Sequence, residues 1–78
     1  MKLWLLRPID GVKDWEPWYD KAFGNVVRAE DETGARELAA LKEGAEGKDA
    51  WLNNKKSTCI ELTTEGKAEH IIQDFAAA

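Results

Sequence analysis

The chain has 78 residues, 44% of them hydrophobic, and carries a formal charge of −4 at pH 7. A chain of this length forms one domain, here 1–78, and buries only about 60–65% of its unfolded surface, so we expect a thin core and no deep substrate cleft. The acidic balance argues against direct binding of nucleic acid, which usually requires a basic face.

The first predicted strand is 2–7, KLWLLR, which ends at Pro8. Successive side chains of a strand point to opposite faces, so Leu3 and Leu5 share one face and Trp4 and Leu6 share the other. Large apolar groups on both faces predict a central strand or one that is covered on both sides.

Residues 8–22 form a long connection that is rich in aromatic and acidic residues, and 25–30, NVVRAE, is the second predicted strand. The stretch 31–44 predicts the only helix, with Asp31 as the N-cap and Gly44 as the stop. The apolar stripe of this helix is expected at Ala35, Leu38, Ala39 and either Leu41 or Lys42.

After the helix, 45–57 reads as a polar loop that carries Trp51 and Leu52. The stretch 58–64 alternates and predicts a third strand, with Ile60 and Leu62 inward and Cys59 on the other face. A fourth strand is predicted at 70–76, HIIQDFA, joined to the third as a hairpin.

These elements follow the order β-β-α-β-β. They predict an α+β fold: a small antiparallel sheet of about four strands, with one helix packed on a face and a long aromatic loop.

The segment 14–24, DWEPWYDKAFG, concentrates aromatic side chains in that loop. One helix is too small to cover four strands, so we expect the two tryptophans of the segment, Trp15 and Trp18, to be buried over the sheet together with Phe23. Rings that point inward would turn the neighbouring carboxylates toward solvent.

The charge is unevenly distributed. Residues 10–32 hold seven acidic and three basic side chains, so this stretch alone has the net charge of the whole chain. An ordinary solvated surface is one reading; an acidic binding surface is the other. The residues expected to form that surface are Asp14, Glu16, Asp20, Glu30, Asp31 and Glu32.

No catalytic, metal-binding or cofactor-binding motif is recognisable. Cys59 and His70 occur once each, and a thiol dyad between them lacks any sign of a lowered thiol pKa. One Cys and one His are too few for a structural zinc site. Lys55 and Lys56, near Trp51, are too few to hold a phosphate backbone. We therefore expect a protein that is not an enzyme and that needs no cofactor or metal.

The compartment follows from the same residues. A single cysteine forms no internal disulfide and suits a reducing cytosol. The start, MKLWLLRPID, lacks the length and the cleavage site of a signal peptide, and no apolar segment is long enough to cross a membrane.

Three segments together resemble a known group: MKLWLLRP, then WEPWYDKAFG with VVRAED and AREL after it, and finally STCIELT with II and DFAAA. This pattern is similar to a family of short phage and prophage proteins, and WEPWYDKAFG is its most specific part. The chain differs from the usual pattern at Asn25 and Gly34.

The resemblance extends to anti-CRISPR proteins that inhibit the type I surveillance complex (Cascade), type I-C in particular. It implies a monomer in the host bacterial cytoplasm that binds subunits of the complex. The acidic surface would then block target DNA recognition, as a DNA mimic on a basic channel. Two alternatives stay open: a phage structural or replication accessory protein with a protein-binding role, and a small hydrolase or thiol enzyme.

Overall fold

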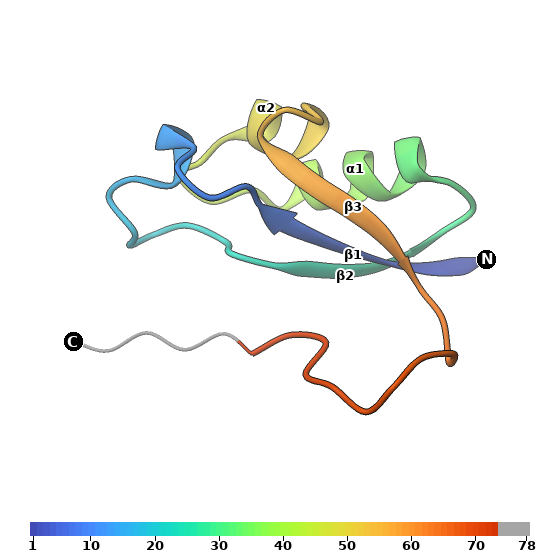
Figure 1. The fold of residues 1–78 in the computed structure, drawn as a ribbon. Coiled ribbons are helices and arrows are strands. Elements are labelled where there is room, and N and C mark those ends of the chain that lie inside the picture. The colour runs from blue at the N-terminus through green and yellow to red at the C-terminus, as the bar shows by residue number, and fades with distance from the viewer. Residues whose placement is uncertain (74–78) are drawn as a thin grey trace.

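Strand β1, Lys2–Pro8, is the centre of a three-stranded antiparallel sheet with the order β2-β1-β3 (Figure 1). β2 spans Asn25–Ala29 and β3 spans Ser57–Leu62. The structure is a computed structural model and describes residues 1–73. β1 is central because apolar side chains alternate onto both of its faces, as the sequence predicted.

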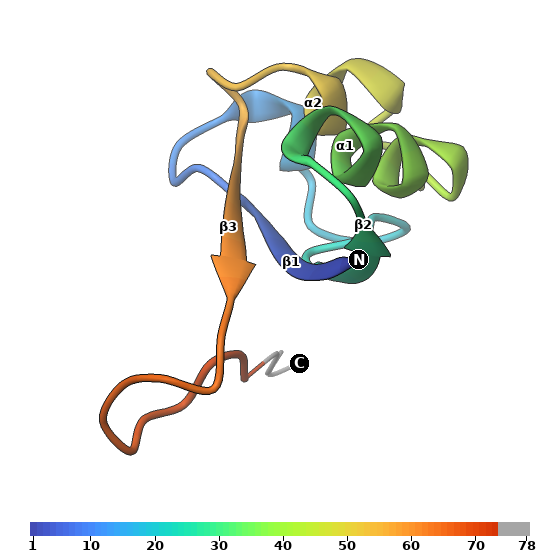
Figure 2. The same cartoon turned by 90° about the vertical axis from the view of Figure 1, so that its right-hand side faces the viewer.

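Two helices cover one face of this sheet (Figures 1 and 2). α1 spans Glu32–Leu41 and α2 spans Lys48–Leu52. The predicted N-cap is confirmed, because Asp31 Oδ1 accepts a hydrogen bond of 2.8 Å from the amide of Gly34. The helix ends at Leu41, earlier than the predicted stop at Gly44.

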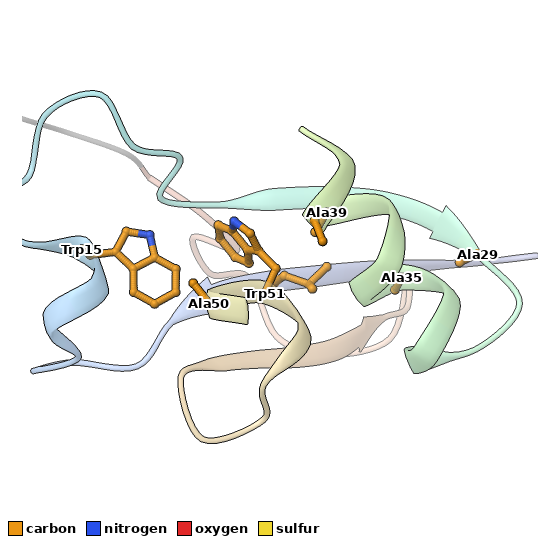
Figure 3. Close-up of a cluster of buried hydrophobic side chains, with 8 residues drawn as sticks. Trp15, Ala29, Ala35, Ala39, Ala50 and Trp51 are labelled. Atoms are coloured by element: carbon orange, nitrogen blue, oxygen red, sulfur yellow. The ribbon is translucent and has the colours of Figure 1, made fainter. Parts of the chain in front are cut away.

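The core lies between the helices and the sheet (Figure 3). Leu6 and Trp51 are fully buried in it, and the Trp15 ring meets the Trp51 ring edge to face with 5.2 Å between the centroids. The other buried members of this apolar cluster are all alanine: Ala29, Ala35, Ala39, Ala40 and Ala50. The short alanine side chains let α1 pack closely on the sheet, so the two indole rings supply most of the apolar volume.

The prediction that the leucines of α1 face the core is wrong: Leu38 is 43% exposed and Leu41 is 70% exposed. The helix instead turns alanines and Arg36 inward. Arg36 Nη1 donates to the carbonyl of Trp51 and to Ser57 Oγ, both at 2.9 Å, and Nη2 donates to the Ser57 carbonyl at 3.0 Å. A buried guanidinium requires such partners, and satisfying them sets the rotation of the helix.

The face of β3 that packs against the core is the opposite of the predicted one. Cys59 pairs with Leu6 and packs against the core, whereas Ile60 pairs with Leu5 on the other face and is 58% exposed. Alternation shows that two faces exist, but the register with β1 decides which of them meets the helices.

The polar loop predicted at 45–57 contains a helix. α2 forms within it and places Trp51 in the core, although glycine and lysine flank the segment. This helix is not predictable from the sequence, because so short a helix has too few residues to display a periodic pattern.

The described residues form three strands, so the four-strand sheet is not found. Residues 70–73 of the predicted fourth strand are not in a strand, and 74–76 lie outside the described residues. The segment after β3 passes along the sheet face opposite the helices (Figures 1 and 2). There Ile72 Cδ1 lies 2.7 Å from the position that a Cβ on Gly24 would take, so that glycine permits the close approach.

Candidate functional site

The aromatic loop, defined here as residues 14–24, is fastened to the core by Trp15. Trp15 is buried, as predicted, and its Nε1 donates a 2.7 Å hydrogen bond to the carbonyl of Ala22 within the same loop. A short 3₁₀ turn, Lys13–Trp15, directs the ring inward. The start and the end of the loop are therefore tied to each other.

A buried carboxylate ties the loop to the connection between α1 and α2. Glu46 Oε1 accepts from the amide of Ala22 at 3.1 Å, and Oε2 accepts from the amide of Gly44 at 3.0 Å and from Trp51 Nε1 at 2.6 Å. Burial alone would raise the pKa of Glu46, but the hydrogen bonds to the ionised form outweigh it and hold the pKa below its ordinary value.

The backbones of the loop and the connection also meet directly. The amide of Ala45 donates a 2.7 Å hydrogen bond to the carbonyl of Asp20, whose φ is 61°. A Cβ on Gly44 would lie only 2.7 Å from that carbonyl oxygen and 2.9 Å from the Cα of Lys21, so this contact requires glycine. Gly44 is thus a contact residue and not the helix stop that the sequence predicted.

Trp18 does not follow Trp15 into the core: it is 60% exposed, and Tyr19 beside it is 58% exposed. The prediction of a buried Trp18 is therefore wrong. The two rings pack edge to face with centroids 6.1 Å apart, and Lys21 Nζ lies 5.8 Å from the centre of the Tyr19 ring. Large exposed aromatic rings at the end of a fixed loop are typical of protein-binding surfaces.

The six predicted carboxylates lie in two groups at opposite ends of the sheet (Figure 1). One group belongs to the loop before β2 and the other follows β2. Five residues of strand separate them, which is roughly 16 Å at the usual rise per residue. The structure thus does not join them into one patch: Asp14, Glu16 and Asp20 are at one end, and Glu30, Asp31 and Glu32 are at the other.

Three of these carboxylates already have structural roles. Asp14 Oδ2 lies 2.9 Å from Lys56 Nζ, Glu32 Oε2 lies 2.8 Å from Arg36 Nε, and Asp31 caps α1. Within residues 1–73, the side chains of Glu16, Asp20 and Glu30 form no hydrogen bond or ion pair. We name the exposed set at the end of the loop the aromatic tip: Glu16, Trp18, Tyr19 and Asp20.

The thiol dyad finds no support in the geometry. Cys59 faces the helices, where burial raises the pKa of its thiol. His70 is exposed in the segment on the opposite side of the sheet, and its Nδ1 lies 3.0 Å from Gln73 Oε1 (Figure 1). Among the residues that the structure describes, no cluster of three or more His, Cys, Asp or Glu side chains is placed to hold a metal ion.

Two features of the site were missed by sequence reasoning. The role of Glu46 leaves no periodic signal in the sequence, and one of its three donors, the amide of Ala22, lies 24 residues away. The outward position of Trp18 had a signal in Pro17: Glu16 is extended, so Trp15 and Trp18 do not share a helical face despite their spacing of three.

Within the described part of the chain, no helix has both the length and the apolar character needed to span a membrane. Comparison of the chain with known protein families, with curated proteins and with solved structures gave no significant match. The case for a function therefore depends on the aromatic tip and on the resemblance carried by the sequence segments.

Proposed function

We propose that this chain is a phage-encoded anti-CRISPR protein that acts in the host bacterial cytoplasm, binds the type I surveillance complex and blocks target DNA recognition. Two observations support the proposal. The chain resembles a family of short phage and prophage proteins, most specifically through WEPWYDKAFG, and is similar to inhibitors of this class. The same segment carries the aromatic tip, which presents two exposed rings between two carboxylates that have no partner within residues 1–73.

The chemistry of the aromatic tip suits a surface that normally binds DNA. Such a surface presents Arg and Lys, and RNA-guided effectors hold nucleic acid in a basic channel. The rings of Trp18 and Tyr19 would stack on guanidinium groups as bases do, with about 0.5–2 kcal/mol for each cation–π contact. Glu16 and Asp20 would accept charge-assisted hydrogen bonds in the place of phosphates.

The tip is fixed before it binds. Trp15, the Glu46 carboxylate and the Ala45 amide hold the two sides of the loop, so little conformational entropy remains to be lost on association. A fixed pair of aromatic side chains is therefore a better anchor than the same residues would be in a mobile loop.

The size of the tip limits the mechanism. Its two free carboxylates and two rings are too few to imitate a long duplex, and the second acidic group is at the other end of the sheet (Figure 1). We therefore propose that the protein covers one DNA-recognition site on a subunit of the complex. It makes no direct contact with nucleic acid, and it acts as a monomer.

The test is a competition between this protein and target DNA for purified type I surveillance complex, after pull-down has shown which subunit binds. Trp18→Ala removes a central anchor and should weaken inhibition by about 30-fold, or about 2 kcal/mol. Glu16→Lys should slow association, and the difference from wild type should shrink as salt is raised.

Matched controls come from exposed positions outside the tip. Leu52→Ala is the control for Trp18→Ala, and Glu65→Lys is the control for Glu16→Lys. Both controls should inhibit as well as wild type. If the double variant Trp18→Ala, Glu16→Lys inhibits as well as wild type, the binding face lies elsewhere. A pull-down that retrieves phage proteins and no subunit of the complex would favour the structural or replication accessory role.

A further inference from the structure

A second candidate binding surface lies at the end of the sheet opposite the aromatic tip. A cleft of about 490 Å³ opens there between the end of β2 and the exposed side of α1. Its inner surface includes Ala29 and Gly34, and its apolar wall is formed by Leu38 and Leu41. These are the leucines that the core does not use.

The cleft is a fixed feature of the fold. Trp4 Nε1 donates a 3.1 Å hydrogen bond to the carbonyl of Ala29, which holds the end of β2, and Asp31 caps the facing turn of α1. A Cβ on Gly34 would lie 3.6 Å from the Ala29 Cβ and 3.2 Å from Asp31 Oδ1, on the inner surface of the cleft. Glycine at 34 therefore leaves this part of the inner surface without a side chain.

The apolar wall needs a covering larger than a small molecule. Leu38 and Leu41 are three residues apart and so share one face of the helix. They are 43% and 70% exposed, and Met1, which also lines the cleft, is 83% exposed. A small apolar ligand inside the cleft would leave the outer parts of these side chains in water, whereas a protein segment laid across it would cover them.

The charges around the cleft indicate the charge of the partner that would bind there. Glu30, Asp31 and Glu37 line the cleft, against the Arg28 side chain and the N-terminal ammonium of Met1, so negative charge is in excess. An acidic partner would be repelled, and a neutral apolar one would leave the carboxylates unpaired. We propose that this cleft binds a segment of another protein in which an apolar side chain is flanked by Lys or Arg. This inference does not depend on the function proposed for the aromatic tip.

A second copy of the chain is the nearest competing occupant. Leu52 is 47% exposed and lies near Lys55 in the sequence, so the chain itself carries an apolar side chain close to a basic one. Such a contact would join unlike surfaces of two copies and generate rings or open chains of many copies. Two copies that each carry −4 also repel one another at low salt, so we assign the cleft to a different, basic partner.

The experiment is an NMR titration of the full-length, ¹⁵N-labelled protein at low salt. The probe is a short synthetic peptide of leucine and lysine in amphipathic helical spacing, and its counterpart replaces every lysine with glutamate. We expect the lysine peptide to shift amide signals within 28–41 and the glutamate peptide to shift none. Leu41→Ser should weaken binding about tenfold, which is about 1.4 kcal/mol. The matched control, Leu52→Ser, should leave the affinity unchanged.

Leu38→Ser and Glu37→Lys provide second tests of the wall and the charge, and circular dichroism checks that each variant is folded. Each should weaken binding of the lysine peptide. The assignment is overturned if the peptide does not bind, if it shifts the aromatic tip instead, or if both peptides bind equally. It is also overturned if the protein alone self-associates and Leu41→Ser abolishes this, because a second copy would then occupy the cleft.

Discussion

Replacing Glu46 by glutamine tests whether one buried carboxylate holds the aromatic loop against the helices. The substitution preserves the shape of the side chain but exchanges one acceptor oxygen for an NH₂ donor. Oε1 serves the amide of Ala22, and Oε2 serves both the Gly44 amide and Trp51 Nε1. Either orientation of the new amide group therefore leaves at least one donor facing another donor.

The loss of stability in Glu46→Gln can be calculated from the number of donors left without an acceptor. A buried donor left without a partner costs about 1–3 kcal/mol. For a domain of this size, each kcal/mol lowers the Tm by about 4–8 °C. Since the sheet and α1 do not depend on Glu46, the loss should appear as a less stable but still folded protein. Glu65→Gln, at an exposed position, is the control and should leave the Tm unchanged.

The stabilising effect of Glu46 should depend on pH. The folded-state pKa of Glu46 lies below its ordinary value of 4.5, so its carboxylate stabilises the fold fully above about pH 4.5. That contribution is lost as the pH falls through the folded-state pKa, where the wild-type side chain becomes a neutral acid. The stability difference between wild type and Glu46→Gln should therefore be large at pH 7 and should narrow below pH 4.5.

The assay is urea unfolding followed by tryptophan fluorescence at neutral and acid pH, together with the DNA competition described above. We expect Glu46→Gln to inhibit less well than wild type, because a loosened loop no longer presents a fixed aromatic tip. Identical midpoints for the two proteins at pH 7, or a difference that stays the same at acid pH, would refute the role given to this carboxylate.

The other predictions concern the core, the helix cap and the thiol. Trp15→Ala should cost about 3–5 kcal/mol because it empties a core position, whereas Trp18→Ala should change stability by less than about 0.5 kcal/mol; urea melts that show equal losses would contradict this contrast. Asp31→Ala should cost about 0.5–2 kcal/mol through loss of the cap to Gly34, again measured in urea, and a neutral result would reject the cap. Cys59 should react slowly with iodoacetamide in the native protein and much faster in urea, since burial raises its thiol pKa; equal rates in the two states would show an accessible thiol.

Some features of the fold were decided by residues close together in the sequence. β1 was predictable because alternating large apolar side chains over 2–7 suit only a strand covered on both faces. The start of α1 was predictable because Asp31 and Gly34 form the cap within a single turn. Both are indicated by patterns that lie within a few consecutive residues.

Other features depend on contacts between distant segments. Trp15 and Trp18 have equal hydrophobicity, and it is the meeting of Trp15 with Trp51 that sends one ring inward and leaves the other exposed. The leucines of α1 point away from the core because Arg36 must reach Trp51 and Ser57, which lie far along the chain.

The candidate site likewise has features set by local sequence and features set by contacts between distant segments. The sequence by itself determined that aromatic and acidic residues are concentrated in 14–24, and that the net charge lies in 10–32. Only the tertiary structure decided that these carboxylates divide between two ends of the sheet and that Trp18 and Tyr19 form an exposed tip. Local patterns specify which residues alternate or cap, but which face is buried depends on what packs against it.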